Sequence, residues 1–267
     1  MRLYRPLFNQ RHGTQDSALR PNPVRSYASC GCLDPQSARR GWPELKVHCE
    51  VQDTTSDAWE ALEQYISEVA SSGADELNPI EALGPERWER IVTLPRSIQN
   101  LKSVRFLCLY GSHLVRIPPE IGEMTSLAEF DPYTSYCLHW FPYEITHCRQ
   151  LKQSRVSTRA LYGNYKYRPP FPQLPVVVAD GLPVACSVCS GPFSEAGPHQ
   201  VWISLFVATD VLPLLVHACS KECILALPNP PSGYIEKPHT GGLQVRQPPA
   251  KSPVFSQRPS NNPNSIH

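Results

Sequence analysis

The residues with the clearest capacity for chemistry are four cysteines in the C-terminal third of the chain. Cys186 and Cys189 form a C-x-x-C pair in "ACSVCSGPF", and Cys219 and Cys223 follow in "HACSKEC". A C-x-x-C turn brings two sulfurs to one tetrahedral ion at about 2.3 Å, and a second pair fills the other two corners. The pattern Cys186-x2-Cys189-x29-Cys219-x3-Cys223 therefore predicts a structural Zn²⁺ site.

Two other uses of these sulfurs remain open at this stage. His217 precedes Cys219 by two residues, so in a strand both side chains face the same side. His217 is therefore an alternative ligand or a hydrogen-bonding neighbour of the site, and a site without metal is the third possibility. Redox chemistry is disfavoured, because "SGPF" after Cys189 turns away from the helix that follows a thioredoxin-like C-x-x-C. The N-terminus has no apolar secretory segment, so we expect a reducing, cytoplasmic compartment without disulfides.

The segment between the two cysteine pairs predicts the elements that position them. "VWISLFVA" and "LPLLVHA" are rich in β-branched and apolar residues and predict a hairpin, and "CSKECILAL" predicts a short helix that carries Cys219 and Cys223 in its first turn. Gly191 is the residue expected to take a positive φ after the turn. A knuckle, a hairpin and a helix with the last ligands resemble the treble-clef zinc fingers. The resemblance implies a zinc-stabilised module over residues 181–228.

An internal repeat occupies the middle of the chain. Pro95, Pro118 and Pro142 align at spacings of 23 and 24 residues, and Ile98, Ile121 and Ile145 fall into the same register. Such a period with apolar residues at fixed offsets is typical of stacked repeats, in which each turn buries its apolar face against the next. The first unit reads "LKSVRFLCLYGSHLVRIP", in which Leu107 and Leu109 are the inward residues of a short strand.

This unit resembles the bacterial and signalling-scaffold type of leucine-rich repeat, over residues 92–164. The resemblance implies an α/β fold, a short solenoid whose ends need caps. Residues 47–91, which are acidic and contain the helical pattern "SDAWEALEQYISEVASSG", are expected to form the N-terminal helical cap. In the second unit Phe130 and Pro132 replace the strand leucines, which puts a regular strand there in doubt.

The remaining segments are rich in proline or basic residues. We expect residues 1–46 to be a disordered basic leader, residues 165–180 a Pro-rich linker extended along the repeats, and residues 229–267 a largely disordered Pro-rich tail. Cys30 and Cys32, in the leader, are interpreted as inert thiols, since their spacing is too short for a zinc knuckle and no partner is evident.

The functional surface predicted for the repeats is formed by the outward-pointing residues of the strands. The stretch "EFDPYTSYCLHWFPYEI" concentrates aromatic and acidic residues where the repeat pattern breaks, and exposed aromatic residues are typical of interface hot spots. Burial of the same aromatics at the degenerate end of the repeats is the alternative. The candidate partner-binding residues are Phe106, Tyr110, Glu129, Asp131 and Tyr133.

Composition and motifs narrow the class of function. The net charge is +1 and 18% of residues are charged, and no catalytic motif is present, so we expect no enzyme. No segment is long and apolar enough for a membrane span. Nucleic-acid binding through the zinc module is the alternative function, but residues 181–230 contain Lys221 as their single Lys or Arg, and phosphate contacts need cations. We therefore expect a scaffold protein that binds an unidentified protein partner.

Overall fold

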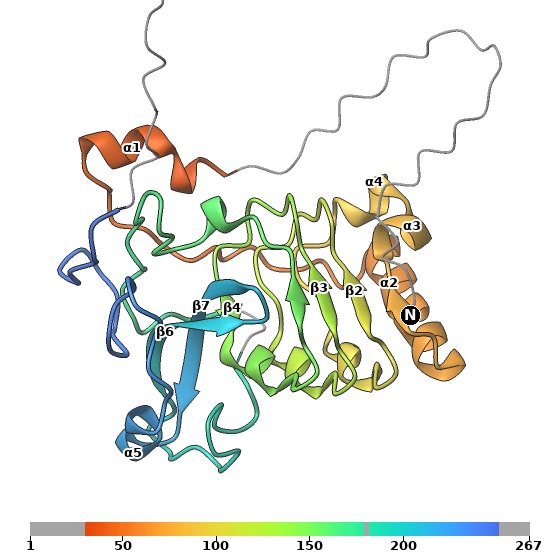
Figure 1. The fold of residues 1–267 in the computed structure, drawn as a ribbon. Coiled ribbons are helices and arrows are strands. Elements are labelled where there is room, and N and C mark those ends of the chain that lie inside the picture. The colour runs from red at the N-terminus through yellow and green to blue at the C-terminus, as the bar shows by residue number, and fades with distance from the viewer. Residues whose placement is uncertain (1–29, 179–181, 251–267) are drawn as a thin grey trace, which may run out of the picture.

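The computed structural model describes residues 30–178 and 182–250, and Figure 1 shows their fold. The α-helices of these residues are α1 (Pro35–Arg40), α2 (Asp57–Ser72), α3 (Pro79–Leu83), α4 (Pro85–Trp88) and α5 (Lys221–Leu225). The strands are β1 (Glu76–Leu77), β2 (Phe106–Cys108), β3 (Glu129–Asp131), β4 (Phe141–Pro142), β5 (Gln153–Ser154), β6 (His199–Val207) and β7 (Asp210–Ala218). The 3₁₀ helices are η1 (Gly31–Leu33), η2 (Arg96–Asn100), η3 (Pro119–Glu123), η4 (Tyr143–His147) and η5 (Thr158–Ala160).

The middle of the chain forms a four-stranded parallel sheet in the order β1-β2-β3-β5. Phe106 pairs with Glu129 and Glu129 pairs with Gln153, so the strands repeat at the spacings of 23 and 24 residues found in the sequence. Each repeat also supplies one 3₁₀ helix, η2, η3 or η4, on the far side of the core. The aligned isoleucines of these helices, Ile98, Ile121 and Ile145, are all 0% exposed. The predicted register and the mixed α/β class with a parallel sheet are therefore confirmed.

Strand β3 corrects the doubt about the second repeat. Phe130 occupies the leucine position and is 1% exposed, and its ring packs edge-on against Phe141 with 5.8 Å between centroids. A phenylalanine is wider than a leucine, but Phe141 begins β4 immediately beside it and fills the same layer. The strand therefore stays regular although the leucine pattern is broken.

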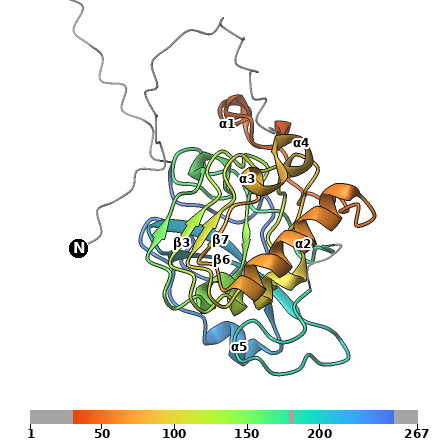
Figure 2. The same ribbon diagram turned by 90° about the vertical axis from the view of Figure 1, so that its right-hand side faces the viewer.

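The helical segment covers the β1 end of the sheet (Figures 1 and 2). Helix α2 buries Leu62, Ile66 and Val69 on one face, as its periodicity predicts. Its N-cap is Ser56, whose hydroxyl accepts from the Trp59 N–H. Gly73 ends the helix with a left-handed φ of 67°, a conformation that glycine adopts without strain.

The other end of the repeats is covered by the predicted hairpin. β6 and β7 pair antiparallel over nine residues each, and β7 also pairs in parallel with β4, so the hairpin continues the repeat segment as a second sheet. Alternate residues of β6 face opposite sides. Val201, Ile203 and Leu205 belong to the large core of the repeats, whereas Trp202 belongs to a smaller core on the other face.

The Pro-rich segment 165–178 and the first part of the tail build that smaller core. Phe171 and Leu174 are buried there, and Trp202 donates its indole N–H to the Pro172 carbonyl at 2.9 Å. The tail continues the packing, because His239 exchanges two backbone hydrogen bonds with Trp202. The expectation of a largely disordered tail over 229–267 is therefore wrong for residues 229–250, where backbone pairing and aromatic packing hold a segment without apolar periodicity. Residues 251–267 and 179–181 lie outside the described residues.

The N-terminal segment corrects a second expectation. Residues 1–29 lie outside the described residues, but 30–46, predicted to belong to a disordered leader, contain η1 and α1. The segment then runs extended along the repeats towards α2 (Figure 1). Tyr162 donates to the Lys46 carbonyl, Arg116 donates to the Glu50 carbonyl, and Gln52 accepts from the Val92 N–H. The partners in these contacts come from successively earlier parts of the repeat segment. The contacts provide hydrogen bonds for polar groups of a segment that has no apolar periodicity of its own.

Candidate functional site

The four predicted cysteines come together at the end of the hairpin. Cys186 and Cys189 lie on a turn before β6, Cys219 follows the last residue of β7, and Cys223 lies in α5. Their sulfurs all lie within 4.8 Å of one another, in an arrangement that could hold a metal ion. We call this set the C-terminal cluster. Helix α5 begins after Cys219, with Ser220 as its N-cap, so only one of the two last cysteines is helical.

The distances within the C-terminal cluster fit a tetrahedral ion. Cys219 Sγ lies 3.6 Å from both Cys189 Sγ and Cys223 Sγ. Four sulfurs at about 2.3 Å from a central ion would be about 3.8 Å apart in a regular tetrahedron. These two distances are therefore close to those of a four-cysteine site, and all four sulfurs lie within 4.8 Å of one another.

The turn at Cys186 is built to stabilise thiolates. Burial disfavours the charged form of Cys186, but the N–H groups of Val188 and Cys219 point at its sulfur at 3.4 and 3.3 Å. These and neighbouring hydrogen bonds prevail and lower the pKa of Cys186 to about 6. The turn is completed by Ser190, which has a φ of 60°, so the positive φ falls there and not at the predicted Gly191.

Mutual repulsion limits how many of these sulfurs can ionise on their own. Hydrogen bonds from Cys219 to the neighbouring sulfurs, with Cys189 first, raise the pKa of Cys219 to about 12. One thiolate in the group therefore opposes the next. A bound cation removes that opposition, because a coordinating thiol is deprotonated outright.

His217 lies beside the C-terminal cluster without joining its sulfurs. Strand β7 ends at Ala218, and Gln200, whose side chain is also hydrogen-bonded to the Val176 backbone, donates to the His217 Nε2 at 3.2 Å. Burial lowers the pKa of His217 to about 4, so the ring is neutral at physiological pH. Its backbone is nevertheless important to the turn: His217 N–H donates to Ser187 Oγ, and His217 carbonyl accepts from Ser187 N–H, both at 2.9 Å.

The solvent-facing side of the parallel sheet carries the predicted partner-binding residues. Phe106, Tyr110 and Glu129 are partly exposed, and Tyr133 is 41% exposed. Asp131 is more enclosed than expected, at 9%. The aromatic stretch is partly exposed, as an interface would require, and partly buried at the end of the repeats. Trp140 and Phe141 are buried in the cores, whereas Tyr133 and Tyr136 reach the surface.

Arg155 completes this face and was not predicted. Its guanidinium pairs with Asp131 Oδ2 at 2.8 Å and lies 5.0 Å from the centre of the Tyr133 ring and 5.8 Å from that of Tyr110. The two tyrosine rings are 6.2 Å apart. The signal in the sequence is the repeat spacing, since Arg155 follows Asp131 by 24 residues, but the degenerate third repeat obscures it. We call Tyr110, Asp131, Tyr133 and Arg155 the recognition cluster.

Two buried residues of the repeats with nucleophilic groups make structural contacts. Ser112 is 0% exposed and its hydroxyl lies 2.7 Å from that of Ser135, which joins two consecutive repeats. Cys148 is buried, and its thiol donates to the Ile121 carbonyl at 3.1 Å.

A second group of potential metal ligands was missed. Cys30, Cys32, His48 and His139 bring their ligand atoms within 4.8 Å of one another. We call this set the N-terminal cluster. The interpretation of Cys30 and Cys32 as thiols without a partner is wrong, because the fold supplies two histidines. The sequence alone could not show this, since 109 residues separate Cys30 from His139.

Comparison with known proteins adds little. No protein-family model matches the chain, and no curated protein matches it. Among solved structures, a leucine-rich repeat protein of Leptospira interrogans matches with 18% identity over 43% of this chain and 42% of that one, with a TM-score of 0.23. The chain thus spans less than half of that protein, and so low a score carries no argument. Within residues 30–178 and 182–250, no helix has the length and apolarity to cross a membrane.

Proposed function

We propose that this protein is an interaction scaffold built on a short leucine-rich-repeat solenoid over residues 92–164, which binds a protein partner through the solvent-facing side of the parallel sheet. The single observation that carries this proposal is the recognition cluster. Its residues come from three successive repeats and lie side by side through the strand register. Rows of side chains presented by stacked repeats are how such proteins form extended binding surfaces.

The recognition cluster has the composition and rigidity of an interface hot spot. Tyrosine and arginine are the residues that contribute most often to binding energy at protein interfaces. Here Arg155 is held by the Asp131 carboxylate and by two aromatic rings, so its side chain loses little conformational entropy when a partner binds. The preformed geometry favours binding of a folded or extended protein segment.

The C-terminal cluster is proposed to hold a structural Zn²⁺ in a treble-clef-like module over residues 181–228. Four cysteines that reach one point are typical of closed structural zinc sites, which leave no position for a substrate. The supporting observations are the sulfur spacing near 3.6 Å and the N–H groups aimed at Cys186. Bound zinc would fix the turn, β7 and α5 to one another.

Neither catalysis nor nucleic-acid binding is part of this proposal, and the compartment proposed is the cytoplasm. Lys221 is the single Lys or Arg residue of the proposed zinc module, and phosphate neutralisation needs several. A mobility shift with generic DNA that weakens with salt would favour the nucleic-acid alternative instead.

The test of the scaffold function compares variants of the full chain in one capture experiment. Proteins bound by the wild type are identified by mass spectrometry, purified, and titrated against Tyr133→Ala, Arg155→Ala and the control Phe206→Ala. Phe206 is 66% exposed on β6, which belongs to the second sheet. We expect at least about tenfold weaker binding for the two face variants, as for a hot-spot residue, and unchanged binding for the control. Binding that survives both face variants would overturn the proposal.

A further inference from the structure

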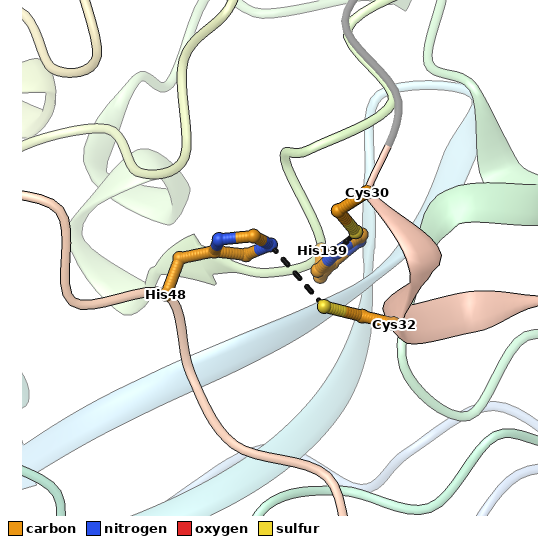
Figure 3. A group of neighbouring side chains, drawn as sticks. All are labelled: Cys30, Cys32, His48 and His139. Carbon is orange, nitrogen blue, oxygen red and sulfur yellow. Dashed lines mark hydrogen bonds between the residues drawn. The ribbon is translucent and has the colours of Figure 1, made fainter.

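The N-terminal cluster joins two distant parts of the fold. Cys30 and Cys32 flank the start of η1, His48 lies on the extended segment that follows α1, and His139 lies in the loop between β3 and β4. Figure 3 shows the four side chains turned towards one another. His139 is 1% exposed, so the group reaches into the interior of the protein and is not a chance surface contact.

The contacts between ligand atoms pair each sulfur with one imidazole nitrogen. Cys30 Sγ lies 3.0 Å from His139 Nε2, and Cys32 Sγ lies 3.7 Å from His48 Nε2. Tetrahedral Zn²⁺ with sulfur at about 2.3 Å and nitrogen at about 2.0 to 2.1 Å would place such a pair about 3.6 Å apart. The observed sulfur–nitrogen distances of 3.0 and 3.7 Å thus lie on either side of the distance expected for a Cys₂His₂ zinc site.

The outer contacts of both histidines point to metal binding independently of these distances. His48 Nδ1 lies 2.8 Å from Glu50 Oε1, and His139 Nδ1 is hydrogen-bonded to the Ala160 carbonyl. A metal ion at Nε2 would leave the proton on Nδ1, where each histidine has an acceptor for it. Metal-ligating histidines almost always donate their second N–H to a carboxylate or a backbone carbonyl, and this cluster shows one of each.

We propose that Cys30, Cys32, His48 and His139 form a second zinc site, which fastens the N-terminal segment to the last turns of the repeats. The ligands are two thiolates and two neutral imidazoles, a set that closes the coordination sphere and assigns the ion a structural role. The site would anchor the start of the extended segment 41–56, whose later contacts, from Tyr162 to Val92, follow the repeats in reverse order.

The test measures zinc bound per chain by elemental analysis of the purified full-length protein. The informative variants are Cys32→Ser, His48→Ala and His48→Cys, and the control is Cys49→Ser, an exposed cysteine next to His48 that is outside the cluster. We expect Cys32→Ser and His48→Ala to bind one zinc fewer than the wild type. Cys49→Ser is expected to match the wild type, and His48→Cys to recover the lost ion, because cysteine is also a zinc ligand. This recovery separates ligand loss from damage to the fold.

Zinc bound at the C-terminal cluster is measured separately, with the double variant that combines Cys189→Ser and Cys223→Ser. If both sites bind zinc, the wild type holds two ions, and each set of variants removes one. Equal zinc in the wild type, Cys32→Ser and His48→Ala would overturn the second site while leaving the C-terminal one intact. Zinc that is lost only in the N-terminal variants would support the second site and contradict the C-terminal one.

Discussion

The guanidinium of Arg155 and the carboxylate of Asp131 form a 2.8 Å ion pair between neighbouring strands of the parallel sheet. The pair is partly exposed to solvent, with the Arg155 side chain 43% exposed. Its contribution to the free energy of folding is therefore small, at most about 1 kcal/mol. Its position beside two tyrosine rings is the basis of the recognition role proposed for it.

Replacement of Arg155 by alanine should therefore separate binding from stability. We expect the free energy of unfolding of Arg155→Ala to fall by less than about 1 kcal/mol, as for an exposed ion pair. Partner affinity should fall by about tenfold or more, because the tyrosines lose the group that orders them. Urea denaturation and binding titration of the same preparation give both values. A loss of several kcal/mol in stability with unchanged affinity would show that Arg155 is structural.

Removal of metal from the C-terminal cluster should loosen one region before the rest. In Cys189→Ser, we expect amide hydrogen exchange to accelerate over 186–191 and 219–225, because structural zinc supplies folding free energy directly, about 10 kcal/mol or more in small zinc-finger peptides. Exchange in β2 and β3 should change far less, since the large core holds them. Cys108→Ser serves as the control, because Cys108 lies on the sheet, outside both clusters. Identical exchange in the wild type and Cys189→Ser would contradict a bound metal there.

The features that the sequence predicts correctly are those whose evidence is local. The face of α2, the register of the repeats and the hairpin all depend on periodicity within a few turns, and the C-x-x-C pair is a local motif too. The N-terminal cluster depends on a contact across 109 residues, which no spacing rule encodes, and Arg155 depends on the 24-residue repeat spacing, which the degenerate third repeat obscures. His217 shows the intermediate case: strand alternation places it correctly on one face, but the end of β7 at Ala218 and the contact with Gln200 decide its role.

Gly122 provides a test of how closely the repeats stack. A Cβ atom added there would lie 2.7 Å from the Glu144 carbonyl oxygen and 2.9 Å from its Cβ, and the first of these is backbone that cannot rotate away. Its φ is not in the left-handed region, so the effect of Gly122→Ala is one of space alone. We expect a loss of about 1–3 kcal/mol, as for overpacking elsewhere. Urea denaturation measures it, and unchanged stability would show that η3 and η4 can separate freely.

Glu144 should make the stability of the protein depend on pH. Both of its carboxylate oxygens are buried, and the residue is 7% exposed. Burial raises the pKa of Glu144 to about 7, from an ordinary value of 4.5, although a hydrogen bond with Ser187 acts in the opposite direction. The folded state therefore holds this proton more tightly than the unfolded state, so the stabilisation is complete below about pH 4.5 and is lost as the pH rises through about 7.

Replacing Glu144 with glutamine should remove this pH dependence, because glutamine keeps the shape of the protonated acid and carries no charge. From the shift between 4.5 and about 7, we expect Glu144→Gln to be more stable than the wild type by up to about 3 kcal/mol at pH 8, with the difference falling below about 1 kcal/mol at pH 5. Urea denaturation of both proteins at pH 5, 6, 7 and 8 gives the difference directly, and protonation of other groups cancels between them. Glu86→Gln, at an exposed position of α4, is the control and should parallel the wild type. If Glu144→Gln also parallels the wild type from pH 5 to 8, the carboxylate is hydrated and the burial of its charge costs nothing.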